Sequence, residues 1–141
     1  MKNNNFSIIG FDFGLKRIGV AVGQTVTQTA RPLMTIQAIN GMPQEPIITK
    51  LIQEWQPAVL VVGIPVDMEG KDLSVTQNAR DFAEWLHQQF HLPVHAMDER
   101  LTTKDAREQL FTKGGYKALR SGQVDSVAAQ LILQNWFATR A

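Results

Sequence analysis

The sequence predicts a single α/β domain, spanning residues 1–141, in which helices pack on a mixed β-sheet. Three strand-like apolar segments with short links come first, and helix-like and strand-like segments then alternate to the end of the chain. Short links make neighbouring strands antiparallel, whereas strand–helix–strand units make them parallel. A chain of 141 residues that is 44% hydrophobic and 19% charged is sufficient for one such domain with its own core.

The N-terminal half should contain the antiparallel part of the sheet. Strands are predicted at Ile8–Gly14, Ile18–Gly23 and Arg31–Ile36, because these stretches are rich in apolar residues that favour strands. A turn at Leu15–Arg17 should join the first two into a hairpin, and Asn40–Pro43 is expected to break the chain after the third.

Helical periodicity and one continuous apolar run predict the elements in the rest of the chain. The run 58–64 is apolar on both faces, as in a central strand of a parallel sheet, and the loop 66–70 follows at its carboxyl end, where α/β proteins tend to bind ligands. A shorter strand is expected at 94–97. Helices are predicted at 45–55, at 74–90, from Thr102 or Thr103 onward, and at 123–137. The first of these helices should end before Pro57.

Asp12 is the first candidate for chemistry. It ends an apolar strand, on the face that it shares with Ile8 and Gly10, and a carboxylate in that position is costly unless it is paired, hydrogen-bonded or metal-bound. Gly10 and Gly14 leave room for a ligand or ion to approach. The alternative is that Asp12 only begins a turn, whose geometry the two glycines serve.

Three further acids come from distant parts of the chain. Asp98 and Glu99 end the last strand, and strand alternation lets only one of them face Asp12; the alternative is a solvated strand exit paired with Arg100. Asp125 precedes small residues that would let its helix lie close to the sheet, although it could also be the N-cap of a helix beginning at Ser126.

Carboxylates without histidine or cysteine partners suit the hard cations Mg²⁺ and Mn²⁺. A cluster of three could hold one or two such ions and stabilise the attacking and leaving oxygens in phosphodiester hydrolysis. This pattern of residues favours a metal-dependent nuclease.

Positive charge is concentrated in one segment. The formal net charge is only +1, but residues 100–120 carry six basic and two acidic residues, a local balance of +4 that leaves −3 for the remainder. We expect nucleic acid to bind there, with Tyr116 as a base-stacking candidate and with Lys16 and Arg17 contributing from the first turn. The segment's basic residues are Arg100, Lys104, Arg107, Lys113, Lys117 and Arg120.

The rest of the composition excludes some kinds of site and indicates the compartment in which the protein is expected. The absence of cysteine excludes disulfides, thiolate zinc sites and a cysteine nucleophile. No run has the length of a membrane span or of a secretory signal. A cytoplasmic location, with no membrane partner, is therefore the default expectation.

Five motifs follow one another over almost the whole chain: Phe11–Ala21, Val62–Pro65 with Met68–Gly70, Asp98–Thr103, Gly114–Tyr116 and Val124–Ala129. Together they resemble the bacterial YqgF family. That family has a ribonuclease H-like fold, similar to that of RuvC-type resolvases, and its members are described as nucleases that mature the 5′ end of pre-16S rRNA or as Holliday junction resolvases.

The resemblance implies a five-stranded mixed sheet of order 3-2-1-4-5, bound Mg²⁺ or Mn²⁺, and active-site acids at Asp12, Glu99 and Asp125, with Asp98 as the alternative to Glu99. The related resolvases carry an acid on the fourth strand, which here ends in Gly63. The acid must then come from the fifth strand, about 9–10 Å from the first, a distance that favours the longer glutamate.

The expected partners are precursor rRNA or branched DNA, together with ribosomal particles, and the expected state is a monomer or weak homodimer. A resolvase acting on a symmetric junction should be a dimer. Two other interpretations remain: a non-catalytic RNA-binding factor of ribosome assembly, and an actin-like ATPase, whose first phosphate-binding segment resembles 12–14 but which needs two such halves. Phosphate contacts alone do not distinguish RNA from DNA.

Overall fold

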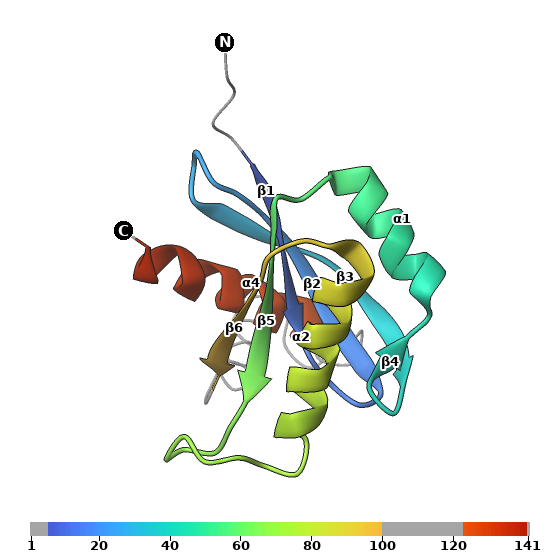
Figure 1. Ribbon diagram of the computed structural model, residues 1–141. Helices are drawn as coiled ribbons and strands as arrows, with labels where there is room; N and C mark the ends of the chain where they lie inside the picture. The colour runs from blue at the N-terminus through green and yellow to red at the C-terminus, as the bar shows by residue number, and fades with distance from the viewer. Residues whose placement is uncertain (1–5, 100–122, 141) are drawn as a thin grey trace.

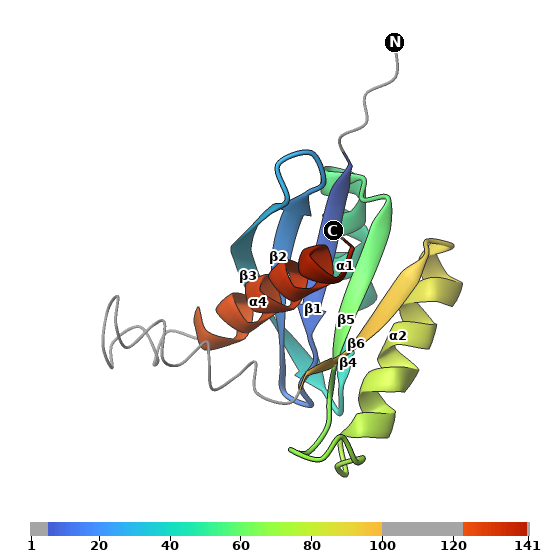
Figure 2. The same cartoon turned by 90° about the vertical axis from the view of Figure 1, so that its left-hand side faces the viewer.

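A computed structural model of the chain describes residues 6–99 and 123–140. One six-stranded sheet forms the middle layer, in the order β4-β3-β2-β1-β5-β6. Helices α1 and α2 cover one face of this sheet and α4 lies across the other (Figures 1 and 2). The strands are β1 Ser7–Asp12, β2 Arg17–Gln24, β3 Thr29–Ile39, β4 Met42–Pro43, β5 Val59–Pro65 and β6 Val94–Glu99; the helices are α1 Glu45–Trp55, α2 Thr76–Phe90 and α4 Gln123–Thr139.

The expected sheet order is confirmed for the five strands predicted from the sequence. β1 pairs antiparallel with β2 and parallel with β5, and β5 pairs parallel with β6. This arrangement places the ends of β1, β5 and β6 at the same edge of the sheet, because parallel strands finish on the same side.

The number of strands was underestimated by one. The segment predicted to break the chain instead makes a tight turn at Asn40 and Gly41, and Met42–Pro43 then pairs with the end of β3 as β4. Both turn residues have positive φ, 52° and 82°, which is what a two-residue hairpin turn requires and what an Asn-Gly pair supplies. The sequence signal was present but was interpreted as a break.

The two helices on the first face end as their sequences predict. α1 ends at Gln56, which adopts a left-handed conformation immediately before Pro57, and α2 ends in the same way at His91. Their apolar sides complete the larger core against β1, β2 and β5, where Phe82 packs edge-to-face on Phe11. The predicted ranges 45–55 and 74–90 therefore match the two helices to within two residues at each end.

The second face of the sheet is shaped to receive α4. Strand alternation sends Ile8 and Gly10 to this face, and Leu133 of α4 fills the space above Gly10, where a Cβ would lie 2.6 Å from its Cγ. The small residues Ala128 and Ala129 of α4 are fully buried there. The helix consequently runs close to β1 and β2, as the small residues after Asp125 predicted.

None of the helices within residues 6–99 and 123–140 combines the length and apolar character needed to cross a lipid bilayer.

Candidate active site at the carboxyl ends of the central strands

Asp12 occupies the middle of the candidate site. It is the last residue of β1 and pairs with Gly19 of β2 on one side and with Gly63 of β5 on the other. The interpretation of Asp12 as a turn residue does not hold, because Asp12 belongs to β1 and is paired with a neighbouring strand on each side. Gly14 does serve the turn, since a Cβ there would overlap the carbonyl oxygen of Arg17.

The two glycines beside Asp12 are covered by the other acids. A Cβ at Gly19 would overlap the backbone carbonyl of Asp125, so the first turn of α4 rests directly on β2. A Cβ at Gly63 would overlap Cδ1 of Ile132 in α4 and would lie 2.9 Å from Cγ of Glu99. Asp125 and Glu99 thus approach Asp12 from opposite sides, across positions that have no side chain of their own.

Electrostatic interaction links Asp12 to Asp125. Burial of the Asp12 carboxyl group, together with the nearby Asp125 carboxylate, raises the pKa of Asp12 to about 7. Two carboxylates close together repel each other unless a proton or a cation lies between them. Burial is the larger cause of the raised pKa, and a cation bound beside the two carboxylates would relieve the part that comes from Asp125.

Asp125 lies within the first turn of α4, which already includes Gln123. The interpretation of Asp125 as the N-cap of a helix beginning at Ser126 is therefore wrong. Its carboxylate instead accepts a hydrogen bond from Nε of Arg17, with Nε and Oδ2 3.1 Å apart. Sequence reasoning missed this pair, although Arg17 and Gly19 lie two residues apart and hence on the same face of β2.

Glu99 and Asp98 point to opposite faces of the sheet. Glu99 lies over Gly63 on the α4 face, and one of its carboxylate oxygens, Oε1, is buried. Asp98 is exposed on the α2 face. The pKa of Arg80 is raised mainly by its hydrogen bond to Asp72, and the charge of Asp98 adds to this effect. The structure brings Glu99 toward Asp12 and does not bring Asp98 there.

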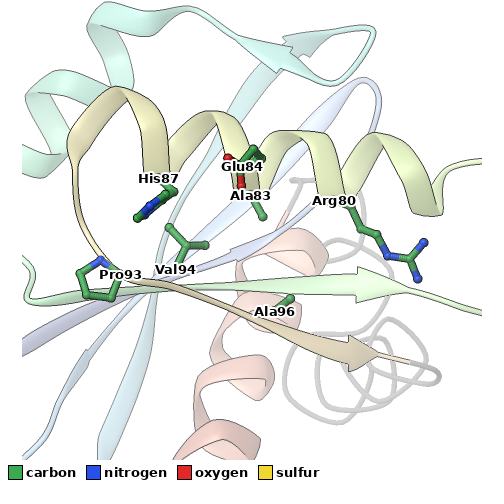
Figure 3. A pocket seen from close by; sticks show the side chains of 7 residues that line it. All are labelled: Arg80, Ala83, Glu84, His87, Pro93, Val94 and Ala96. Carbon is green, nitrogen blue, oxygen red and sulfur yellow. The ribbon is translucent and has the colours of Figure 1, made fainter.

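A groove also lies on the α2 face of the sheet, and it is separate from these acids. It runs between α2 and β6, with Arg80, Glu84 and His87 along the helix and Val94 and Ala96 along the strand (Figure 3). Alternation along β6 places these two strand residues on the same face as Asp98 and opposite Glu99. The groove is consequently not part of the site around Asp12.

The donor set fits a hard divalent cation, but the three acids are not closed around one. Within residues 6–99 and 123–140, no three His, Cys, Asp or Glu side chains stand in an arrangement ready to hold a metal ion. The fit rests on the carboxylate oxygens of Asp12, Glu99 and Asp125, on the close approach of Asp125 and Glu99 to the backbone at Gly19 and Gly63, and on the raised pKa of Asp12.

The predicted nucleic-acid surface is only partly described. Lys16 and Arg17 are exposed in and after the turn that follows β1. The other expected substrate contacts lie outside the described residues: Arg100, Lys104, Arg107, Lys113, Tyr116, Lys117 and Arg120. So does the helix expected from Thr102 or Thr103.

Solved structures share this fold. RuvC of T. thermophilus in complex with Holliday junction substrate matches with a TM-score of 0.56 and 16% identity, over 96% of this chain and 95% of that chain. The fowlpox virus Holliday junction resolvase matches with a TM-score of 0.55 and 13% identity, over 95% of this chain and 98% of that chain. The fold is therefore of the ribonuclease H-like class, as found in these resolvases.

The particular family follows from the sequence matches. The chain belongs to the family described as "RuvX: Holliday junction resolvase", whose model matches residues 6–139, and the resemblance to the YqgF family is thereby confirmed. Relatives from three bacteria are each named "Putative pre-16S rRNA nuclease". They are those of Shewanella oneidensis, 52% identical over 95% of each chain; Aeromonas salmonicida, 55% identical over 92% of this chain and 93% of the relative; and Photorhabdus laumondii, 49% identical over 97% and 99%.

Proposed function

We propose that this protein is a metal-dependent endonuclease that hydrolyses phosphodiester bonds in cytoplasmic maturation of the 5′ end of pre-16S rRNA. The name of its relatives supports this substrate, since about half of all aligned residues are identical over nearly the full length of each chain. Ribosomal precursor particles would then be the partner that presents the RNA.

One observation carries the proposal of nuclease chemistry. Asp12 lies between two glycines, and Asp125 covers one of them while Glu99, together with Ile132, covers the other. Three acids from three separate elements thus lie around the carboxyl end of β1, at the edge of the sheet where α/β proteins tend to bind ligands. A purely structural role would not account for so many acids around a half-buried position.

Asp12, Glu99 and Asp125 are the residues that would hold Mg²⁺ or Mn²⁺. A divalent cation held there would supply a Lewis acid that neutralises charge developing on the phosphodiester oxygens during hydrolysis. Glu99 is favoured over Asp98 for this role, because Glu99 is the acid on the α4 face.

The basic residues would hold the substrate beside these acids. Lys16 and Arg17 lie next to the end of β1, and arginine binds phosphate through several N–H groups at once. The +4 segment 100–120, with Tyr116 in it, would extend this surface along the nucleic acid. The protein itself would be a monomer or a weak homodimer.

Holliday junction resolution is the second candidate function. It is favoured by the family description and by the shared fold with RuvC. Resolution of a symmetric junction requires two cuts, so this function would call for a dimer on the DNA.

A cleavage assay distinguishes these functions. Purified protein is incubated with an RNA that spans the pre-16S 5′ end and with a four-way DNA junction, with Mg²⁺ or with EDTA. Mg²⁺-dependent cutting of the RNA at the 5′ end, abolished by Asp12→Asn, is the expected result. Cutting of the junction alone would support the resolvase. Tight RNA binding with no cutting, the same in Asp12→Asn, would instead indicate a non-catalytic assembly factor.

A further inference from the structure

Arg17 is bonded to one of the acids proposed to hold the metal. Its Nε donates a hydrogen bond to Oδ2 of Asp125, 3.1 Å away. The backbones on both sides of this bond are closely packed, since the Arg17 carbonyl lies against Gly14 and the Asp125 carbonyl lies against Gly19. The pair therefore connects the start of β2 with the start of the described part of α4.

A guanidinium and a divalent cation compete for the same carboxylate. Even if the metal ion bound the other oxygen of Asp125, the two positive charges would lie within a few ångströms and repel each other. In the free protein, Arg17 should accordingly weaken metal binding at Asp125.

The ion pair between Arg17 and Asp125 is weak enough for Arg17 to exchange it for another partner. The Arg17 side chain is 56% exposed and that of Asp125 is 21% exposed, and ion pairs with such access to water contribute little stability. Among the described residues, the terminal nitrogens of Arg17 have no hydrogen-bond partner. They are thus able to bind the two oxygens of a phosphate group.

We propose that Arg17 couples metal binding to nucleic-acid binding. Without nucleic acid, Arg17 neutralises Asp125 and lowers the affinity of the site for the metal ion. A backbone phosphate then draws the guanidinium away, and Asp125 becomes available to the metal. This inference rests on the proposed function, because it needs Asp125 to be a metal ligand, and it adds that the site assembles fully only on its substrate.

The test measures Mn²⁺ affinity by electron paramagnetic resonance, so that no activity is needed. Wild type and Arg17→Gln are titrated with and without a four-way DNA junction, at 4 °C and before cleavage is detectable on a gel. Without DNA, Arg17→Gln should bind Mn²⁺ about two- to fivefold more tightly than wild type. The junction should raise the Mn²⁺ affinity of wild type more than that of the variant, and Mn²⁺ should raise the DNA affinity by the same factors.

Two variants serve as controls. Lys16→Gln removes the same charge from the neighbouring residue, whose side chain bonds to none of the described residues. It should change Mn²⁺ affinity in the free protein less than Arg17→Gln does and should retain the coupling, even if it binds DNA less tightly. Arg17→Lys keeps the charge and should keep the wild-type Mn²⁺ affinity in the free protein.

The outcomes separate this inference from the proposed function. If wild type binds Mn²⁺ but Arg17→Gln binds it more weakly, or if the two glutamine variants behave alike, Arg17 is not the coupling residue. An equal gain in Mn²⁺ affinity on adding DNA to wild type and Arg17→Gln would also overturn the inference. If wild type binds no Mn²⁺ with or without DNA, the metal-dependent function itself is wrong.

Discussion

The first turn of α4 rests on β2 at one point, where the backbone carbonyl of Asp125 lies directly over Gly19. There is no space for a methyl group between them. Gly19 is therefore not interchangeable with alanine, although both residues are small and Gly19 is in a regular strand.

Gly19→Ala should displace the start of α4 and with it the Asp125 carboxylate. Overpacking of this kind destabilises proteins by about 1–3 kcal/mol, and the metal site should weaken at the same time. Urea denaturation and Mn²⁺ titration measure the two effects.

The matched control is Gly23→Ala, on the same face of the same strand. A Cβ there would lie 3.1 Å from the Phe137 ring and 3.2 Å from the Thr29 carbonyl oxygen, contacts that a shift of a few tenths of an ångström relieves. It should cost less stability and leave Mn²⁺ affinity unchanged. Equal losses in both variants would mean that the contact at Asp125 has no special role.

Asp12 should make the metal-free protein less stable as pH rises. The folded protein has a pKa of about 7 at Asp12, against 3.8 for an ordinary aspartate. Between these values the folded form binds more protons than the unfolded form, so its free energy of unfolding falls across this window and levels off above it. The shift sets an upper bound of about 4 kcal/mol on the effect.

Asp12→Asn removes this dependence. In EDTA, the variant should be more stable than wild type at pH 8 and nearly equal to it at pH 4, by denaturant unfolding. The difference between the two proteins cancels other titrating groups, such as His95. A difference that does not change between the two pH values would show that Asp12 ionises freely in the fold.

The two acids at the end of β6 should differ sharply in their effects. Glu99→Gln should reduce cleavage by a factor of at least about 10² if Glu99 holds metal, with the fold intact. Asp98→Asn should leave turnover close to wild type. Asp98 is exposed, and Arg80 is already held by Asp72 at 2.7 and 3.0 Å, so any loss of stability should be within about 0.5 kcal/mol. Single-turnover cleavage assays compare them; an inactive Asp98→Asn with an active Glu99→Gln would reverse the two roles.

The basic segment should provide most of the affinity for nucleic acid. Neutralising Lys113 and Lys117 together should weaken binding to all sequences and flatten the dependence of log K on log salt by roughly 1–2 units. Fluorescence anisotropy at several salt concentrations measures the slope. An unchanged slope would remove these two lysines from the interface.

Local pattern was sufficient to predict most of this fold. Apolar periodicity identified α1, α2 and the central strand β5, because burial of one helical side or of both strand faces leaves a clear trace in the sequence. Alternation along a strand also predicted that only one of Asp98 and Glu99 could face Asp12. These features depend on residues that are close together in the chain.

Contacts between distant residues could not be predicted in the same way. The bond between Arg17 and Asp125 joins positions 108 residues apart, so no local pattern pairs the two residues. Similarly, Gly63 was interpreted as the end of a strand, whereas the structure shows that Ile132 of α4 and Glu99 of the next strand both lie across it. Packing between strands and helices, not local sequence, decides which acids meet.

The central claim is that Asp12, Glu99 and Asp125 form one metal site. Mn²⁺ titration of wild type, Asp12→Asn, Glu99→Gln, Asp125→Asn and Asp98→Asn tests it directly, with circular dichroism to confirm that each variant is folded. The account predicts that Mn²⁺ binding is lost or greatly weakened in the first three variants and retained in Asp98→Asn. Wild-type affinity in a folded Asp12→Asn or Asp125→Asn variant would contradict it.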